Sequence, residues 1–308
     1  MATLHNNAVP SIPAGGATRG VFAGGVDPSY PVTNIVYITI QTLSGSTAFG
    51  SLSVTTGMAT GVSAAGRGVI AGGYTTNSMV VTKLMTYITI LSGGNSITFG
   101  NLPNHSQSAS GFADATRGVF VAGQYGIVDG YNTHDDINYI TIATTGNASA
   151  FGTLARSVNK EGAGCADATR GITGGGTAYV GGWQYFNNID YVTIQTTGNS
   201  TDFGDLDTGH TTMAACADAT RGVFAGGYDA PTDLIQYVTI QTTGNATSFG
   251  ILGLSQGRCS GLADNTRGVF GFYSNMHYIT IATTGNSNSF GNFASNYDSH
   301  LNRASCWG

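Results

Sequence analysis

Residues 19–25, with the sequence R-G-V-F-A-G-G, decide the fold, because close copies of this stretch recur along almost the whole chain. A short apolar run that ends in glycines is typical of a buried β-strand followed by a turn. Six copies at a period near 50 residues predict a repeat architecture. The arginines that open the copies are Arg19, Arg67, Arg117, Arg170, Arg221 and Arg267.

Two further signatures recur with the same period. The motif Y-[IV]-T-I begins at Tyr37, Tyr87, Tyr139, Tyr191, Tyr237 and Tyr278, and the motif F-G begins at Phe49, Phe99, Phe151, Phe203, Phe249 and Phe290. The tyrosine and the phenylalanine are 12 residues apart in every copy, whereas the arginine and the tyrosine are 11 to 22 residues apart. Nearly all of the length variation therefore falls in one connection of each unit.

Each copy is expected to form four short strands. In the copy around Tyr237, alternating β-branched and aromatic residues predict a strand over residues 235–242. The sequence T-T-G-N at the end of this strand is typical of a tight hairpin. An Asp264–Thr266 turn separates the last two strands. The predicted strands are 235–242, 246–250, 259–263 and 268–273. No segment of the chain has the periodicity of an amphipathic helix.

Six four-stranded sheets that are semi-apolar on both faces must cover one another around an axis, which predicts an all-β, six-bladed β-propeller. Residues 303–307 resemble 258–262, a first strand without its second, and the missing second strand matches residues 20–25. We therefore expect the C-terminal strand, about 302–308, to complete the first blade, with Trp307 in the place of Leu262 and Phe112. Residues 17–308 form the propeller, and residues 1–16 form an N-terminal arm.

The composition excludes several classes of partner. The 308 residues carry 11 Lys plus Arg and 16 Asp plus Glu, a net charge of -5 at pH 7, which offers no basic surface for nucleic acid. No apolar run is long enough to insert into a membrane, and the first sixteen residues do not read as a signal peptide. The four cysteines lack metal-binding or redox spacing and are expected to be free and to act as small hydrophobic residues.

The six arginines are candidate structural residues. Asp114, Asp167, Asp218 and Asp264 each lie three residues before one of them and are expected to cap a tight turn. Because Gly16 and Ala64 replace this aspartate in the first two copies, we expect the arginines to contact carbonyl groups of the neighbouring blade or an aromatic face. An alternative places the four carboxylates around a cation at one mouth of the channel. We expect no metal and no cofactor.

Residues for catalysis are sparse. Glu161 is the only glutamate, the G-x-S-x-G and H-E-x-x-H motifs are absent, and the six histidines occupy unrelated repeat positions. One local cluster, His134-Asp135-Asp136, has metal-ligand chemistry, but three adjacent residues converge poorly on one ion, so a solvated loop is expected. The sequence therefore predicts a protein that is not an enzyme.

The variable connections of the third and fourth blades, residues 124–138 and 177–190, are the best candidates for a binding site, because loops carry function on repeat scaffolds. Aromatic rings and amides there suit contact with a glycan or a protein. The alternative is that the rings turn inward and pack their own loops. The candidate receptor-binding residues are Tyr125, Tyr131, His134, Asp135, Tyr179, Trp183 and Tyr185.

The order of apolar run, Gly-Gly, tyrosine and bulky aromatic resembles the Kelch repeat, with phenylalanine where Kelch has tryptophan. The repeat sequence R-G-V-F-A-G-G…Y-V-T-I-Q-T-T-G-N-A-T-x-F-G more closely resembles the Kelch-like propellers found in virion and tail-associated proteins of tailed bacteriophages, notably marine and cyanobacterial ones. The resemblance covers about 290 residues. The copies depart from it at Ala122-Gly123 and at Phe272-Tyr273, where the turn of the last blade must be rebuilt.

The resemblance implies a non-enzymatic virion structural protein, tail-associated or decorating the particle surface, that acts in adhesion. Its partners would be other virion proteins, docked through residues 1–16 or through the propeller's own surface, and a glycan or protein receptor on the host surface. It would be made in the host cytoplasm and released by lysis, which needs no signal peptide. The alternatives are a glycan-binding, lectin-like propeller and a Kelch-type protein-interaction adaptor.

Overall fold

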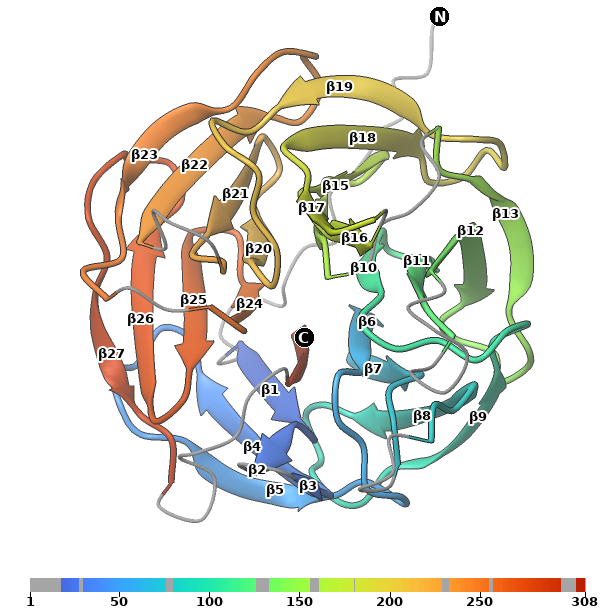
Figure 1. Cartoon of the computed structure of the whole chain (residues 1–308). Coiled ribbons are helices and arrows are strands. Elements are labelled where there is room, and N and C mark those ends of the chain that lie inside the picture. The colour runs from blue at the N-terminus through green and yellow to red at the C-terminus, as the bar shows by residue number, and fades with distance from the viewer. Residues whose placement is uncertain are drawn as a thin grey trace, which may run out of the picture.

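The computed structural model describes residues 18–27, 30–75, 80–125, 133–155, 161–179, 181–228, 233–254, 257–294 and 303–307. Within these ranges the chain forms six four-stranded antiparallel sheets and two small hairpins, with no helix. The six sheets are arranged around a central axis as the blades of a propeller (Figure 1). The all-β, six-bladed propeller predicted from the repeat is therefore confirmed. We number the blades 1 to 6 in chain order of their Arg-Gly strands.

Each blade runs from an inner strand at the axis to an outer strand at the rim. The inner strands, in blade order, are β28 (Ala304–Trp307), β6 (Thr60–Ala64), β10 (Ser110–Ala113), β14 (Ala163–Ala166), β20 (Ala214–Ala217) and β24 (Ser260–Ala263). The second strands, which carry the repeat arginines, are β1 (Arg19–Ala23), β7 (Arg67–Ala71), β11 (Arg117–Gln124), β15 (Arg170–Gly174), β21 (Arg221–Ala225) and β25 (Arg267–Phe272).

The outer half of each blade holds the tyrosine and phenylalanine motifs. The third strands are β4 (Asn34–Thr39), β8 (Leu84–Thr89), β12 (Thr133–Thr141), β18 (Asn188–Thr193), β22 (Leu234–Thr239) and β26 (Asn275–Thr280). The outer strands are β5 (Thr47–Ser51), β9 (Ile97–Asn101), β13 (Ser149–Thr153), β19 (Thr201–Asp205), β23 (Thr247–Ile251) and β27 (Asn288–Asn292). Two hairpins extend blades 1 and 4: β2 (Val26–Asp27) with β3 (Tyr30–Pro31), and β16 (Thr177–Tyr179) with β17 (Trp183–Tyr185).

The hydrophobic core lies between the blades rather than within any one of them. Six clusters of buried residues each combine side chains from two adjacent blades, including the pair formed by blades 6 and 1. In that last cluster Phe22 of blade 1 packs edge-on against Phe293, which follows the outer strand of blade 6, with ring centroids 5.1 Å apart. Every sheet therefore covers the flanks of its two neighbours, which is why the ring needs no second layer.

The ring closes as predicted, but in a different register. The C-terminal strand β28 pairs antiparallel with β1, so that Cys306 faces Val21 and Trp307 faces Gly20. Leu262 faces Val269 in blade 6, at the position of Val21, so Cys306 and not Trp307 occupies the place of Leu262 and Phe112. The expected position of Trp307 was wrong by one residue.

Close packing of the inner strands explains this register. Their second position holds a small residue in every blade, because a larger side chain would meet the neighbouring inner strand. A Cβ on Gly61, for example, would overlap the carbonyl oxygen of Ser305. The observed register places Ser305 at this second position and sends the Cys306 side chain into the core between blades 1 and 2. Cys165, Cys216 and Cys306 are free, as predicted, and they are buried, whereas Cys259 is only partly buried.

The Phe-Gly motif and the T-T-G-N turn form one clamp between neighbouring blades. A Cβ on Gly100 of blade 2 would overlap the carbonyl oxygen of Gly146, in the turn of blade 3 that precedes its outer strand. The Gly146 N–H donates to the Phe99 carbonyl at 2.9 Å, and the Asn147 Oδ1 accepts the N–H of Asn101 at 3.0 Å. The motif glycines that meet the next blade in this way are Gly50, Gly100, Gly152, Gly204, Gly250 and Gly291. The turn thus protects the outer edge of the preceding sheet.

Both departures from the repeat pattern are resolved locally. Ala122 adopts the left-handed conformation (φ 56°) that the first glycine of the pair takes elsewhere, and Gly123 follows at φ 132°. In blade 6, β25 continues through Phe272, and the two-residue turn Tyr273-Ser274 leads directly into β26. The last blade therefore rebuilds this turn as a tight hairpin, as the sequence implies.

Candidate binding face

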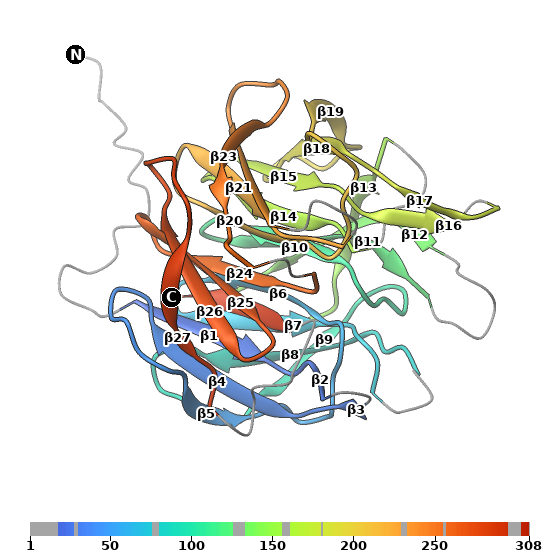
Figure 2. The same cartoon turned by 60° about the vertical axis from the view of Figure 1, so that its left-hand side comes forward.

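The antiparallel order of the strands gives the propeller two different faces. The connections from first to second strand and from third to fourth strand lie on one side, which we call the turn face. The connections from second to third strand and the links between blades lie on the other side, which we call the loop face. Figure 2 shows the hairpin of β16 and β17 projecting from the propeller on the loop face. The described chain enters blade 1 on the turn face, at Thr18.

The six repeat arginines lie on the turn face and join each blade to the next. Each guanidinium carbon lies 4.1–4.6 Å from the centre of the motif tyrosine ring of its own blade. Each Nη1 also donates to a carbonyl oxygen of the following blade, and Arg267 of blade 6 reaches Ile40 of blade 1 at 2.9 Å. Both partners expected from the sequence, a neighbouring carbonyl and an aromatic face, are therefore present together.

Replacing Arg170 by lysine should lower the free energy of unfolding by about 1–2 kcal/mol. Lysine keeps the charge, but its ammonium group cannot both lie flat on the Tyr191 ring and donate to the Ile240 carbonyl, which Arg170 reaches at 3.0 Å. Urea unfolding followed by circular dichroism measures the change. The exposed Lys83 serves as the control, since Lys83→Met should shift the unfolding free energy by less than about 0.5 kcal/mol. An equal loss in both variants would contradict this role.

The four aspartates cap their turns and do not line the channel. In blade 3 the Asp114 Oδ1 accepts the N–H groups of Thr116 and Arg117 at 2.8 and 2.7 Å. Its Oδ2 accepts from Gln195 of blade 4 at 2.5 Å. Equivalent pairs join Asp167 to Gln241 and Asp264 to Gln41. Since these carboxylates are engaged in turns and between blades, the alternative of a cation ring at the channel mouth has no support in the described geometry.

The glutamines of these pairs were not predicted. Blades 1 and 2 have Gly16 and Ala64 instead of aspartate, and the following blades correspondingly have Leu91 and Ala143 instead of glutamine. This joint loss was visible in the aligned copies and hinted at the contact, although Asp218 of blade 5 is retained where blade 6 has Ala282 instead of glutamine.

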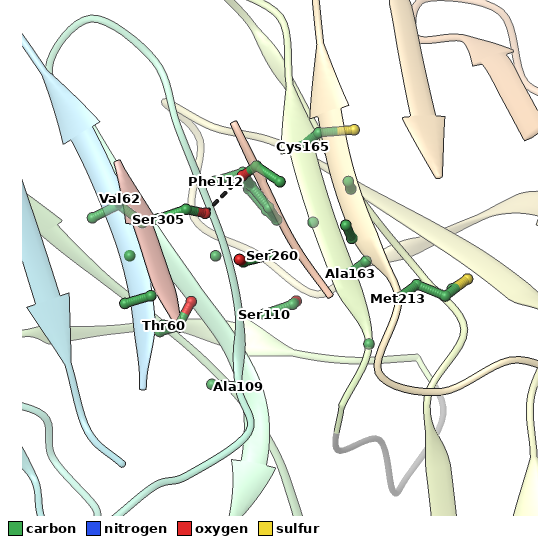
Figure 3. A pocket seen from close by; sticks show the side chains of 18 of the residues that line it. Thr60, Val62, Ala109, Ser110, Phe112, Ala163, Cys165, Met213, Ser260 and Ser305 are labelled. Carbon is green, nitrogen blue, oxygen red and sulfur yellow. Dashed lines mark hydrogen bonds between the residues drawn. The ribbon is translucent and has the colours of Figure 1, made fainter. Parts of the chain in front are cut away.

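The inner strands surround a narrow central cavity of about 140 Å³. Figure 3 shows small and hydroxyl side chains along its wall, among them Thr60, Ser110 and Ser260. The Ser305 hydroxyl donates to the Gly261 carbonyl at 2.6 Å and so links the C-terminal strand to blade 6 across the closure of the ring. Within the described residues, no group of three His, Cys, Asp or Glu side chains is placed to hold a metal ion.

The hairpin of blade 4 carries three of the candidate aromatic residues on one of its sides. Tyr179 pairs with Trp183, and Thr177 pairs with Tyr185, so these side chains share a side while Ala178 and Gln184 lie on the other. Tyr179, Trp183 and Tyr185 are 49%, 40% and 37% exposed. The rings therefore face outward, against the alternative of an inward-packed loop. We call strands β16 and β17 the aromatic ribbon.

A second candidate group, in blade 3, is more buried than expected. Tyr125 lies over His134 with ring centroids 4.7 Å apart, and the His134 Nε2 lies 3.2 Å from the Ser106 hydroxyl. The His134 Nδ1 is 3.6 Å from Asp136, too far for a hydrogen bond. Burial lowers the pKa of His134, although Asp136 opposes this shift, so the imidazole stays neutral near pH 7.

The expectation of a solvated loop at His134-Asp135-Asp136 was wrong. These residues belong to β12, which begins at Thr133 and pairs with a β11 that extends to Gln124. The hairpin of blade 3 is longer than those of the other blades, so it carries His134 under Tyr125. Asp135 lies next to the group, on the same strand. The other predicted residue of this loop, Tyr131, lies outside the described residues.

Three more exposed aromatic residues occupy the loop face and were not among the predicted ones. They are Tyr30, Tyr228 and Tyr273, in the second-to-third connections of blades 1, 5 and 6. Tyr228 directly follows the double glycine, and Tyr273 follows its replacement in the last copy, but this position alone does not predict exposure, because Tyr74 occupies it in blade 2 and is buried. Together with Tyr125 and the aromatic ribbon, they give five of the six blades an exposed ring on this face.

Comparison with known proteins adds no further assignment to this geometry. A scan against protein-family models found no match, and a search of curated proteins found no similar protein. The described residues contain no helix that is long and apolar enough to cross a membrane. Any functional conclusion therefore rests on the fold and on the loop face.

Proposed function

We propose that the chain is a non-enzymatic module of a tailed-phage virion, tail-associated or on the particle surface, that contacts a host receptor through its loop face. The β-propeller fold supports a role as an interaction module in general. The proposal that the loop face contacts a receptor rests on the exposed aromatic residues of this face, since large exposed rings mark contact surfaces. The resemblance of the repeat sequence to that of phage propellers supports the proposal that the chain is a virion protein.

The chemistry of the titratable groups agrees with a role in binding rather than catalysis. His210 is fully buried and lies 2.7 Å from the Thr208 hydroxyl, and His277 lies 2.9 Å from the Ser287 hydroxyl. The turn aspartates accept backbone N–H groups. These groups hold loops and turns in place, which is a structural use of their hydrogen bonds.

Deleting residues 1–16 should leave the propeller folded and prevent its incorporation into the particle. The first strand begins at Arg19, and the chain enters it on the turn face, opposite the aromatic residues. An arm on that side would hold the propeller to other virion proteins with the loop face outward. Purified particles from a phage encoding the truncated chain would be examined by mass spectrometry, and the melting temperature of the truncated protein would serve as the control. A truncated chain found in particles at the normal copy number would overturn this mode of docking.

A lectin-like propeller is the second candidate, and it is compatible with the first. The aromatic ribbon favours it over a Kelch-type adaptor, because three rings on one side of a hairpin form a small, flat apolar surface. Such a surface is typical of sites for small ligands with apolar faces, whereas a protein partner covers about 800 Å² on each side.

A further inference from the structure

The aromatic ribbon is a firmly held platform. Isolated two-stranded hairpins are only marginally stable, so other contacts must hold this one. The Thr177 hydroxyl donates to the Gln184 carbonyl at 2.8 Å within the ribbon, and Ala178 is fully buried beneath it. At its base, the N–H of Gly176 donates to the carbonyl of the buried His210 at 2.7 Å, and His210 donates its own N–H to Phe186 at 3.2 Å. The rings are thus presented with little conformational entropy left to lose on binding.

The rings of the ribbon are arranged as a shallow corner. Tyr179 and Trp183 face each other across the hairpin with centroids 5.5 Å apart and planes at 75°. Tyr185 follows two residues after Trp183 on the same side. A sugar ring has one apolar C–H face and a rim of hydroxyl groups, so it can lie on one aromatic plane while its edge meets the second. Three rings on one short hairpin form a surface far smaller than the roughly 800 Å² that a protein partner covers, which suits a small ligand such as one or two sugar residues.

The charges on the loop face decide which saccharides fit. Among the described residues this face has an acidic excess, whereas the turn face is nearly balanced. The loop-face acids are Asp27, Asp135, Asp136, Glu161, Asp205, Asp207 and Asp233, and the bases are Lys83, Arg258 and Arg303. The turn-face acids are Asp114, Asp167, Asp202, Asp218 and Asp264, and the bases are the six repeat arginines. A sulfated, carboxylated or phosphorylated polymer would be repelled by the loop face.

We propose that the aromatic ribbon binds a neutral saccharide and that the acidic loop face discriminates against anionic ones. This inference rests on the proposed function, since it takes the loop face to be the one that meets the host. The rings supply the apolar contact, and the acidic excess of the loop face adds no positive charge that would attract anions.

The test uses the full chain and immobilised polysaccharides. Dextran, mannan and galactan are the neutral probes, and dextran sulfate is the charged counterpart of dextran. We expect binding to at least one neutral polysaccharide, weaker binding to dextran sulfate than to dextran at low salt, and at least a tenfold loss of affinity for the bound polysaccharide in Trp183→Ala. Gln184→Ala is the matched control, since Gln184 lies on the other side of the same ribbon.

Three results would overturn the inference: binding to none of the neutral probes, a preference for dextran sulfate, or unchanged affinity in Trp183→Ala. A parallel assay with cells of a susceptible host separates this failure from that of the proposed function. If Trp183→Ala reduces cell binding while no neutral polysaccharide binds, the receptor is of another class and the proposed function stands. If the variant binds cells as the parent chain does, the role of the ribbon in adhesion fails as well.

Discussion

Replacing Gly100 by alanine is expected to lower the free energy of unfolding by about 3 kcal/mol and the melting temperature by roughly 6–12 °C. The new Cβ would overlap the carbonyl oxygen of Gly146 in the next blade, and a backbone atom within a tight turn cannot move aside. The clamp would have to open, which would also lengthen the hydrogen bond from the Asn101 N–H to the Asn147 side chain. Calorimetry on the purified chain measures the shift.

The partner glycine is the matched control for this prediction. A Cβ on Gly146 would meet no atom within 4 Å, so Gly146→Ala places the same methyl group in open space on the other side of the same contact. We expect its melting temperature to stay within a degree or two of the parent chain. Equal effects of the two substitutions would show that the turn does not seat on the Phe-Gly motif as described.

Removing residues 303–308 should abolish most of the stability of the ring. This deletion takes away β28, whose four residue pairs with β1 close blade 1, and the Cys306 side chain that fills the core between blades 1 and 2. It also removes Arg303, which donates to the Tyr273 carbonyl at 2.7 Å and lies over the Phe293 ring. At about 1 kcal/mol for each lost hydrogen bond plus the lost burial, the loss is about 5 kcal/mol, comparable with the whole stability of many domains.

Thermal unfolding and size-exclusion chromatography of the shortened chain test this prediction. We expect a broad transition at lower temperature and association through the exposed edge of β1. A chain that lacks only Gly308 keeps all four pairs and should melt as the parent does. A sharp, unshifted transition in the longer deletion would show that closure of blade 1 contributes little.

The blades could be predicted because each signature is local and occurs six times. The constant spacing of 12 residues reflects one contact: Tyr237 on the third strand meets Phe249 on the outer strand edge-on, at 6.0 Å. Equivalent tyrosine–phenylalanine pairs occur in all six blades at 6.0–6.3 Å. The contact joins neighbours in one hairpin, so its sequence separation is fixed by the hairpin itself.

Contacts between blades were harder to infer, because they join residues far apart in the chain. The pair formed by Gln41 and Asp264 spans 223 positions, and only comparison of the copies hints at it. The register of β28 was missed for a related reason: a strand of four residues offers too short a pattern, and the need for a small residue at its second position comes from the neighbouring strand.

The candidate site was predictable in location but not in detail. The longest connections held the aromatic ribbon and the Tyr125–His134 contact, as length variation suggested. The Gly181-Gly182 pair between Tyr179 and Trp183 is a hairpin turn signal, but which rings share a side of the ribbon also depends on the register of the two strands, which this pair alone does not fix. The burial of His134 depended on three extra residues of β12, which turn signals alone did not reveal.

The buried thiols have a consequence for where such a molecule can persist. Burial raises the pKa of Cys306 to about 12 and that of Cys216 well above its usual value, so neither carries appreciable thiolate at neutral pH. Oxidants attack thiolates, and disulfide exchange also requires them. These two thiols should therefore resist oxidation and disulfide exchange both in a reducing cytosol and in aerated water outside a cell.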